Sequence, residues 1–433
     1  MPFEAAPLAP RRIAVIGGGI SGLGAAHFLS DAHRVTLFEA ESRLGGHART
    51  VIAGKRGDQP VDTGFIVFNY ANYPHLARLF EHLDVPVTES DMSFGASLWG
   101  GRMEYALRNI DSLFAQRANC VDPRFLRMIR DILRFNARGY DLSRREGMTI
   151  GDLLGELRSG PWFRDCYLLP FSGAIWSTPK DKILDFPART MLDFFRNHAL
   201  LGARGQHQWY TVQGGSSEYV HRLEADLRRR GVDLRPGCAV TAVRRTQAGV
   251  EIAVPGAAPE LFDEVVFATH SDVALRLLAD PSAEEHALLS AVRYQPNEIV
   301  LHSDTSIMPR RRKVWSSWNY TEVADKRSDR IDVTYWMNSL QPIPMDDPLF
   351  VTLNSTRPIR EELIHDTVTL DHPVYDAAAL AAQRRMPEIN GANRTWFCGA
   401  WVKNGFHEDG LSSAFDVADA ILRRPAIEEI AAE

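Results

Sequence analysis

A glycine-rich turn near the N-terminus constrains the fold of this chain more than any other feature. It follows the β-branched, apolar run Arg12–Ile16, which is typical of a buried parallel strand. The turn reads GGGISG and matches the pattern GxGxxG through Gly17, Gly19 and Gly22. The first glycine permits a tight turn, the second lets the backbone approach a diphosphate, and the third lets a following helix pack close to the strand. We expect this helix over Leu23–Ser30, with its N-terminus directed at the phosphates.

The segment after this helix completes a βαβ unit. Arg34–Phe38 has the composition of a second buried strand, and Glu39 stands at its end. A carboxylate in this position accepts hydrogen bonds from the ribose hydroxyls of an adenosine. Because strand, helix, strand and acid follow one another in the right order and spacing, the sequence indicates a dinucleotide-binding unit. The alternative is a glycine-rich turn that binds no ligand.

The next segment distinguishes between dinucleotides. Residues 43–50 read RLGGHART, and here the chain resembles the flavin amine oxidase and phytoene desaturase superfamily, in which an RxGGR-type segment follows the dinucleotide fold. The resemblance implies FAD, with Gly45 and Gly46 beside its diphosphate and flavin, because only glycine leaves room for so close an approach. His47 stands where arginine is usual, and Arg49 is a candidate for the missing charge. Both a covalent bond between His47 and the flavin and ordinary packing of its ring are open.

Two further segments resemble parts of the same superfamily. Residues 62–66 (DTGFI) resemble the segment that passes the isoalloxazine ring, although a plain turn before a strand would look alike. The block that begins with the glycines of residues 213–216 resembles the return of the chain to the FAD domain. In that block the strand around Val240 is expected beside the adenine. The block is predicted to hold a helix over Ser217–Arg230 and strands at 231–234, 239–243, 250–254 and 264–268.

The C-terminal segment carries the second strong signal. Thr395–Ala400 predicts a strand that ends at glycine, and residues 405–414 (GFHEDGLSSA) enter a helix that continues through Leu422. Superfamily members place the start of this helix under the N1–C2 edge of the flavin. The free N–H groups and the dipole of a helix start stabilise the negative charge of a reduced flavin. Cys398 is expected to be a buried strand residue rather than a flavin attachment site.

The resemblance therefore implies FAD as the cofactor and a set of residues that contact it. No metal site is expected, and the sequence identifies no catalytic residue. Many amine oxidases of the superfamily hold a lysine near the flavin N5 atom, and Lys313 is our suggestion for it. The residues expected to contact FAD are Gly17, Gly19, Ile20, Ser21, Gly22, Glu39, Ala40, Arg43, Gly45, Gly46, His47, Gly64, Phe65, Val240, Gly399, Asp409, Gly410 and Leu411.

The two strong signals lie at opposite ends of the chain, so a compact FAD domain has to be discontinuous. The expected fold is α/β, with a Rossmann-like FAD-binding domain of the amine-oxidase type and an inserted α+β substrate domain. The FAD-binding domain is expected over residues 10–65, 205–270 and 386–425, and the substrate domain over 66–204 and 271–385. Within the substrate domain we expect helices at Tyr73–Leu83, Pro123–Ala137, Ile150–Leu157 and Ala188–Leu200 and aromatic strands at Val314–Tyr320 and Val333–Asn338.

Composition limits the class of protein. A net charge of −6 argues against a nucleic-acid binder, and the four cysteines form no CxxC pair that would suggest a zinc site or a redox dithiol. The sequence shows no signal peptide and no apolar stretch of about 18 residues, so we expect a cytoplasmic protein without a spanning helix. Pro123–Arg138 predicts a basic amphipathic helix, which suits either peripheral contact with the inner face of a membrane or a solvated surface.

The chain shows one GxGxxG unit and no second nucleotide fold, so we expect an organic substrate to reduce the flavin by hydride transfer to N5. The segments GGHART, DTGFIVFN and GFHEDGLSSA resemble a bacterial subgroup that includes fatty-acyl desaturases and isomerases. The first hypothesis is therefore dehydrogenation of a lipid acyl chain, with a small hydrophobic molecule or a membrane phospholipid as substrate. The alternatives are a flavin amine oxidase of a small or polyamine substrate, a fatty acid double-bond isomerase, and a flavin-binding redox sensor without turnover. The oligomeric state is open.

Overall fold

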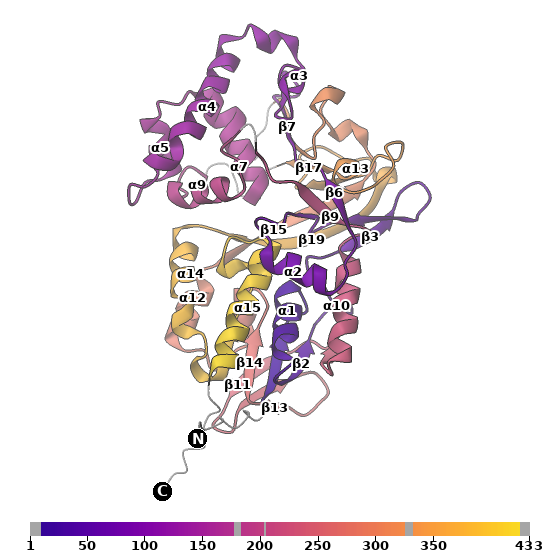
Figure 1. The fold of residues 1–433 in the computed structure, drawn as a ribbon, viewed down its shortest axis with the longest axis vertical. Helices are drawn as coiled ribbons and strands as arrows, with labels where there is room; N and C mark the ends of the chain where they lie inside the picture. Colours follow the sequence, from indigo (N-terminus) through magenta and orange to yellow (C-terminus); the bar gives the residue numbers. More distant parts are fainter. Residues whose placement is uncertain (1–9, 177–182, 203–204, 325–331, 425–433) are drawn as a thin grey trace, which may run out of the picture.

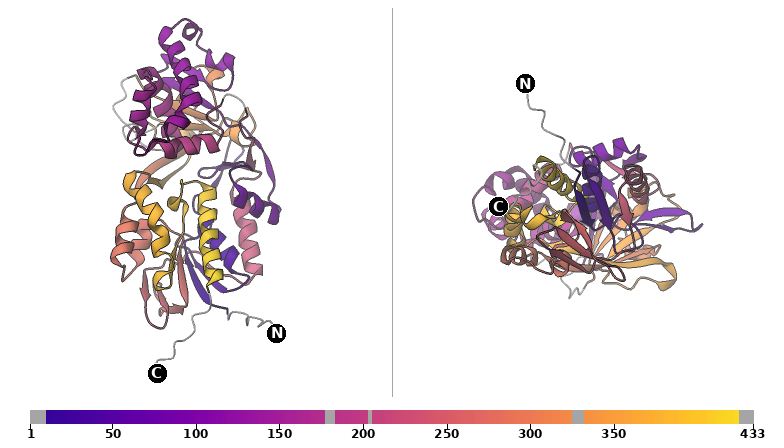
Figure 2. Two further views of the ribbon diagram at one scale, coloured as in Figure 1. Left: turned by 60° about the vertical axis from the view of Figure 1, so that its left-hand side comes forward. Right: turned by 90° about the horizontal axis from the view of Figure 1, so that it is seen from below.

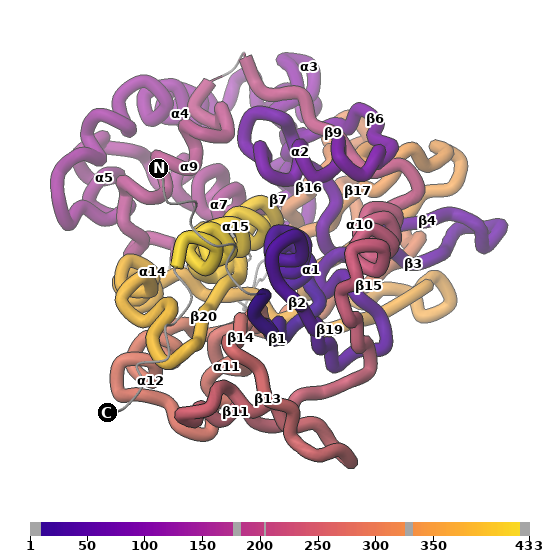
Figure 3. Tube along the Cα trace, turned by 60° about the horizontal axis from the view of Figure 1, so that its bottom comes forward, coloured from indigo at the N-terminus to yellow at the C-terminus, as the bar shows by residue number. Residues whose placement is uncertain are grey.

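The structure, a computed structural model, describes residues 10–176, 183–202, 205–324 and 332–424. The molecule is elongated, and its two lobes are stacked along the long axis (Figure 1). Figure 2 shows the same two lobes from the side, with the parallel sheet in the lower one. Segments from both ends of the chain lie side by side in the lower lobe, where the indigo helix α1 runs next to the yellow helix α15 (Figure 3).

The lower lobe is built on a five-stranded parallel sheet with the strand order β10-β2-β1-β14-β20. The central strand β1 pairs in parallel with β2 on one side and with β14 on the other. The strand order therefore reverses at β1, and sheets of this kind bind ligands outside the carboxyl ends of their strands at such a point. The strands are β1 (Arg12–Ile16), β2 (Arg34–Phe38), β10 (Asp233–Arg235), β14 (Glu264–Phe267) and β20 (Thr395–Phe397).

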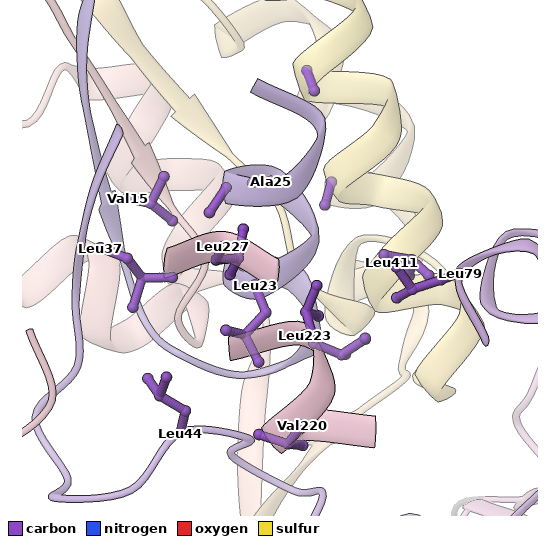
Figure 4. Close-up of a cluster of buried hydrophobic side chains, with 14 of the residues drawn as sticks. Val15, Leu23, Ala25, Leu37, Leu44, Leu79, Val220, Leu223, Leu227 and Leu411 are labelled. Atoms are coloured by element: carbon purple, nitrogen blue, oxygen red, sulfur yellow. The ribbon is translucent and has the colours of Figure 1, made fainter. Parts of the chain in front are cut away.

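Alternate residues of β1 serve two separate cores, because successive side chains of a strand point to opposite faces. Ile13 and Val15 pack in the core shared with α1, α2, α10 and α15, whose centre is drawn in Figure 4. Ala14 and Ile16 face a second core under a small antiparallel sheet and three helices. The helices of the first core are α1 (Ile20–Leu29), α2 (Pro74–His82), α10 (Ser217–Arg229) and α15 (His407–Arg423). The elements of the second core are the strands β11 (Ala242–Arg245), β12 (Val250–Ala253) and β13 (Glu260–Phe262) and the helices α11 (Ser271–Leu277), α12 (Ala283–Ser290) and α14 (Ala377–Ile389).

The upper lobe contains a seven-stranded sheet with the order β19-β15-β18-β17-β16-β7-β8. Its strands pair antiparallel except for β16 with β7, which are parallel. The strands are β7 (Phe94–Leu98), β8 (Met103–Ala106), β15 (Arg293–His302), β16 (Trp318–Thr321), β17 (Val333–Trp336), β18 (Phe350–Leu353) and β19 (Ile364–Val374). The helices that pack on its β7–β8 end are α3 (Ile110–Leu113), α4 (Pro123–Leu142), α5 (Ile150–Glu156), α6 (Pro161–Phe163), α7 (Leu169–Trp176) and α9 (Ala188–Asn197), with a π-helical turn at Arg164–Leu168.

Short elements connect the two lobes. The hairpin β3–β4 and the three-stranded sheet β5-β9-β6 lie between them. These strands are β3 (Thr50–Ala53), β4 (Gln59–Asp62), β5 (Val67–Phe68), β6 (Val87–Ser90) and β9 (Trp209–Val212). The remaining elements are α13 (Met337–Leu340) and 3₁₀ turns at Arg117–Cys120, Thr305–Ile307, Arg312–Val314, Glu361–Leu363, Ala392–Arg394 and Ala400–Val402.

A buried carboxylate joins these connecting elements. Asp62, at the end of β4, accepts hydrogen bonds from the hydroxyl of Thr50 at 2.6 Å, from the N–H and hydroxyl of Ser216 at 2.8 Å each, and from the amide of Gln341 at 2.9 Å. Burial raises the pKa of Asp62 to about 6, although the hydrogen bonds from Thr50 and Ser216 oppose that shift by stabilising the charged form. One side chain thus ties the hairpin, the start of α10 and the upper lobe together.

Several element predictions are wrong in their boundaries, and two of them lie close to the glycine turn after β1. Helix α1 begins at Ile20 rather than Leu23, because Gly19 already takes the extended conformation of an N-cap. Val240 lies outside any strand, since β11 starts only at Ala242. The chain around Val240 instead lies beside the end of β2, where the N–H of Cys238 donates to the carbonyl of Glu39 at 2.8 Å.

The two aromatic strands are shorter than predicted. Only Trp318–Thr321 of the first run is a strand, because the N–H groups before it bond to side chains: Ser316 donates to the Asn319 amide oxygen at 2.9 Å and Ser317 to the Ser93 hydroxyl at 3.1 Å. The second run is a strand only to Trp336, after which α13 begins.

Two observations bear on the organisation of the chain. Helices α11 and α12 share the core of the parallel sheet, although their residues fall in the range predicted for the substrate domain. The domain boundaries themselves stay a prediction. Among the described residues, no helix combines the length and the apolar character that crossing a bilayer requires.

Candidate functional site

The glycine turn after β1 needs two of its three motif glycines for its own geometry. Gly17 has φ +107°, which L side chains rarely adopt, and its N–H donates to the carbonyl of Phe38 at 2.8 Å. A Cβ at Gly22 would overlap the carbonyl oxygen of Gly17. These two positions therefore have to be glycine for the turn to form at all.

Gly19 is different, because nothing in the chain requires it to be glycine. Its φ is −75°, and a Cβ built there would meet no atom nearer than the Cα of Gly46 at 4.0 Å. In the described part of the chain, no acceptor is paired with the N–H groups of Gly19, Ile20 and Ser21. An open space lined by free N–H groups at a helix start is the arrangement that receives a diphosphate. The residues present therefore fit the dinucleotide predicted from the sequence.

Glu39 is held in place at the end of β2. One carboxylate oxygen accepts the N–H of Gly18 at 2.6 Å and the other accepts the N–H of Glu41 at 2.8 Å. Each oxygen keeps a free lone pair, and the side chain is half-buried. Ala40 beside it is exposed. The carboxylate is thus oriented and accessible, as hydrogen bonding to a ribose requires.

The second glycine pair packs directly on the first turn. The N–H of Gly45 donates to the carbonyl of Gly18 at 2.8 Å. Gly46 has φ +54°, and a Cβ at this position would lie only 3.1 Å from the Cα of Gly19. Arg43 stabilises this loop, because its guanidinium donates a hydrogen bond to the carbonyl of Gly46 at 3.0 Å. The segment predicted to run along the diphosphate therefore forms one wall of the space beside Gly19.

His47 lies between two other histidines, with the cation of Arg43 also nearby. Its ring lies 6.0 Å from that of His270 and 5.7 Å from that of His372, between centroids. Burial, followed by the two neighbouring imidazoles, lowers the pKa of His47 to about 3, so the ring is neutral at physiological pH. Arg49 does not supply the missing charge, because its guanidinium pairs with both oxygens of Asp366 at 2.7 and 3.0 Å.

The two helices from opposite ends of the chain meet at their N-termini. A Cβ at Gly410 would lie 2.9 Å from the side chains of both Ile20 and Ser21, so glycine is what lets α15 start against the start of α1. Phe406 donates its N–H to the carboxylate of Asp409 at 2.9 Å, which caps the first turn of α15. Of the described acceptors, none pairs with the N–H groups of His407, Glu408 and Asp409.

Two predicted C-terminal contact residues, Leu411 and Gly399, are engaged with the protein interior. Leu411 is fully buried against α1, where a Cβ at Gly24 would overlap its Cδ1 atom, so only its backbone faces the helix start. Gly399 has φ +156° and donates its N–H to the hydroxyl of Ser413 at 2.9 Å. It fixes the end of β20 to α15. Cys398 is buried as expected, and burial raises its pKa to about 12.

The segment around Gly64 and Phe65 also reaches this site. The N–H of Phe65 donates to the carbonyl of His47 at 2.9 Å, and a Cβ at Gly64 would overlap that same carbonyl oxygen. The Phe65 ring stacks on the ring of His407 with 3.9 Å between centroids. The predicted segments 45–49, 63–65 and 405–411 therefore converge.

Sequence reasoning missed His407 and Tyr219, which complete this corner of the site. The Nε2 atom of His407 lies 2.6 Å from the hydroxyl of Tyr219 on α10. Burial and the nearby ring of His47 lower the pKa of His407 to about 3. A histidine inside the segment GFHEDG was visible in the sequence, but only the fold brings the tyrosine to it.

The first turn of α15 holds two carboxylates that are already engaged. Glu408 accepts the N–H groups of His75 and Leu76 at 2.9 Å each and so caps helix α2. Burial raises the pKa of Asp409 to about 6, against the opposing effect of the Phe406 N–H. Both oxygens of Glu408 are thus occupied by backbone N–H groups, and Oδ2 of Asp409 accepts the N–H of Phe406.

Aromatic rings extend from the start of α15 into the upper lobe. Phe406 stacks on Phe194 with 4.9 Å between centroids, Phe194 stacks on His198 at 3.9 Å, and His198 lies parallel to Trp209 at 6.4 Å. We call these four residues the aromatic wall. Its histidine is neutral, because burial lowers the pKa of His198 below its ordinary value. Lys313, suggested as the lysine near N5, is exposed and pairs with Asp111 at 2.8 Å, so that suggestion is wrong.

Known proteins resemble this chain in sequence and in fold. A family model described as flavin containing amine oxidoreductase matches residues 20–337. Among curated proteins, the L-amino-acid oxidase of Gloydius blomhoffii is 47% identical over 49 residues, which are 11% of this chain and 10% of that protein. The chain thus matches about a tenth of the length of such relatives.

Solved structures share the fold over nearly the whole chain. The fatty acid isomerase from P. acnes that produces CLA gives a TM-score of 0.66 at 15% identity, covering 95% of this chain and 98% of that one. Putrescine oxidase bound to putrescine gives 0.70 at 15% identity, covering 96% and 99%. With the family model spanning most of its length, the chain belongs to the flavin containing amine oxidoreductases.

Proposed function

We propose that this enzyme takes a hydride from a hydrophobic substrate, and that a lipid acyl chain is that substrate. In this proposal the N–H groups of Gly19, Ile20 and Ser21 hold the FAD diphosphate, and Glu39 binds the adenosine ribose. The remaining residues predicted from the sequence line the path between that point and the start of α15. The discontinuous FAD domain and inserted substrate domain, with the predicted boundaries, are part of the same proposal.

When bound, FAD supplies the acceptor for the hydride. The chain's own contribution is electrostatic and positional. The free N–H groups of His407, Glu408 and Asp409 point out of a helix start, where they stabilise negative charge without needing a proton. The stack of Phe65 on His407 covers the adjoining surface and excludes water from it.

The aromatic wall is the observation that carries the choice of substrate. It begins at Phe406, next to the predicted flavin end of the site, and its members offer apolar faces and a neutral imidazole. An ammonium substrate would need a free carboxylate or a cage of ring faces. Glu408 and Asp409, the described carboxylates on the first turn of α15, are engaged with backbone N–H groups. These contacts favour an acyl chain over an amine.

The fold itself is compatible with either chemistry, because one solved neighbour is a fatty acid isomerase and another is an oxidase bound to putrescine. Isomerisation stays a second candidate, since it begins with the same removal of a hydride from an acyl chain. It differs in returning the hydride at another carbon. Under the proposal the enzyme works in the cytoplasm, at the inner face of a membrane.

Anaerobic mixing tests the proposal. The FAD-loaded enzyme is mixed with phospholipid extract, with free fatty acids and with a panel of amines, and the flavin absorbance is followed. We expect bleaching by an acyl substrate and none by amines; bleaching by amines alone would refute the acyl assignment. Formation of a shifted double bond without net bleaching would select isomerisation, and no response to any substrate would favour a redox sensor.

A pair of variants adds a structural control. Phe406→Ala removes the first ring of the aromatic wall, and we expect flavin reduction by the acyl substrate to slow by about tenfold for the lost apolar contact. Phe415→Ala removes a ring from the outer side of the same helix, where Phe415 is 41% exposed, and it should leave the rate unchanged. Equal effects of the two variants would contradict the role of the wall.

A further inference from the structure

One end of the upper lobe concentrates exposed apolar side chains. Of the eleven large hydrophobic side chains that are exposed among the described residues, five lie between residues 107 and 133: Leu107, Ile110, Val121, Leu126 and Leu133. They come from α3, from α4 and from the segments just before each of these helices, at the end of the molecule opposite the parallel sheet (Figure 1). Single exposed hydrophobics are ordinary, but a group of this kind marks an interaction surface.

The same stretch is basic, in a chain whose net charge is −6. Residues 107–142 hold seven arginines and four aspartates, with no lysine or glutamate. The run Arg310–Lys313 adds four more basic residues, and it lies next to α3 because Lys313 pairs with Asp111 there. We call residues 107–142 together with 310–313 the basic edge. Positive charge is thus gathered on one end of an otherwise acidic protein.

Helix α4 shows how the two properties are combined. Its inner face is satisfied, since Phe125, Met128 and Phe135 are fully buried in the upper core. Its outer face carries Leu126 and Leu133, which are 44% and 59% exposed and lie two turns apart on one side.

Arginines flank these two leucines. Arg127, Arg130 and Arg134 surround the buried carboxylate of Asp131 at 3.6–3.7 Å, so three cations share one anion and carry excess positive charge. Leucines between arginines on an exposed helix face are typical of helices that lie in the headgroup region of a bilayer.

We propose that the basic edge binds the surface of an anionic lipid bilayer. Charge complementarity selects this occupant: the arginines meet anionic headgroups while the exposed leucines enter the boundary between headgroups and acyl chains. The inference rests on the proposed function for its purpose, because an enzyme that oxidises acyl chains has to reach them where they are stored. Its physical content is separate, since binding to a vesicle needs no turnover.

Vesicle sedimentation with the full-length, FAD-loaded protein tests the inference. We expect binding to vesicles that contain phosphatidylglycerol, little binding to phosphatidylcholine alone, and release by added salt, which screens charges beyond a Debye length of about 10 Å at 0.1 M. Arg130→Gln combined with Arg138→Gln should weaken binding by about tenfold or more, at roughly fivefold per cation. Leu126→Gln combined with Leu133→Gln should weaken it by a similar factor.

A matched control uses apolar residues of equal exposure on another surface. Ile52 and Met345 are each 60% exposed, and Ile52→Gln with Met345→Gln should leave vesicle binding unchanged. The inference is overturned if the wild type ignores anionic vesicles, if the control loses as much binding as the α4 variants, or if the edge binds an oligonucleotide but no vesicle. Flavin reduction by a detergent-dispersed acyl substrate without vesicle binding would refute docking alone. Vesicle binding without any such reduction would refute the proposed function alone.

Discussion

Replacing Gly19 with valine should empty the cofactor site without unfolding the protein. The present structure leaves this position open: φ is −75°, and a Cβ would meet nothing nearer than 4.0 Å. A valine at the N-cap costs the apoprotein only about 1 kcal/mol. Its branched side chain would occupy the space into which three free N–H groups point, and a bound diphosphate needs that space.

The expected loss of affinity follows from those N–H groups. Hydrogen bonds to charged acceptors contribute about 1.5–3 kcal/mol each. If valine keeps the diphosphate from two of the three donors at Gly19, Ile20 and Ser21, the loss is about 3–6 kcal/mol. This corresponds to a rise in the FAD Kd of more than about a hundredfold.

The neighbouring glycine provides the control. A Cβ at Gly22 would overlap the backbone oxygen of Gly17, so Gly22→Ala should destabilise the apoprotein by about 3 kcal/mol or more. The assay is FAD titration by flavin fluorescence, together with thermal unfolding of each apoprotein. Two results would refute the reasoning: FAD affinity unchanged in Gly19→Val, or an apoprotein Tm lowered as much by Gly19→Val as by Gly22→Ala.

Three further predictions test the packing, the ribose contact and the titration of the site. Gly24→Ala should destabilise the protein by about 1–3 kcal/mol despite the higher helix propensity of alanine, because its Cβ would overlap Leu411. Leu411→Ala by itself costs about 2–5 kcal/mol, and the loss caused by Gly24→Ala should be smaller in that background. Additive losses in urea unfolding would contradict the close crossing of the two helices. Glu39→Gln removes the negative charge that accepts hydrogen bonds from the N–H groups of Gly18 and Glu41, and it should weaken FAD binding about tenfold without changing the Tm. Equilibrium FAD titration measures this effect, and an unchanged Kd would contradict the ribose contact. Because the pKa of His47 is lowered in the folded protein, its imidazole binds a proton more readily in the unfolded chain. Its contribution to the free energy of unfolding is therefore complete above pH 6.5 and is lost as the pH falls toward 3. In His47→Gln apoprotein the loss of unfolding free energy between pH 7.5 and 5.5 should be smaller by about 1 kcal/mol, and an equal loss would contradict a buried neutral imidazole.

The parts of the fold that follow from local sequence were predictable. β1, β2 and the acid Glu39 stand where their pattern indicates, because a short, β-branched, apolar run is typical of a buried parallel strand. The convergence of the two chain ends was predictable from the glycines of the two motifs. Gly410 shows the reason, since its missing side chain is what admits α1.

The parts that depend on tertiary partners were not predictable. Arg49 looked free to replace the missing arginine, and only the fold brings Asp366 within 2.7 Å of it from a position 317 residues away in sequence. The aromatic run at residues 314–320 alternates as a strand would, yet the Asn319 and Ser93 side chains take the hydrogen bonds that a strand pairing needs.

The distribution of charge around the site leads to one conclusion about how this protein holds an anionic cofactor. Of the two arginines in the RLGGHART segment, Arg43 donates to the carbonyl of Gly46, and Arg49 pairs with Asp366. His47 and His407 are neutral. Under the proposed function, negative charge at both ends of the cofactor is met chiefly by backbone N–H groups, three at the start of α1 and three at the start of α15. Donors of this kind are buried by the bound ligand and screened little by salt. FAD affinity should therefore change little with ionic strength, whereas attraction between the basic edge and a membrane should fall steeply.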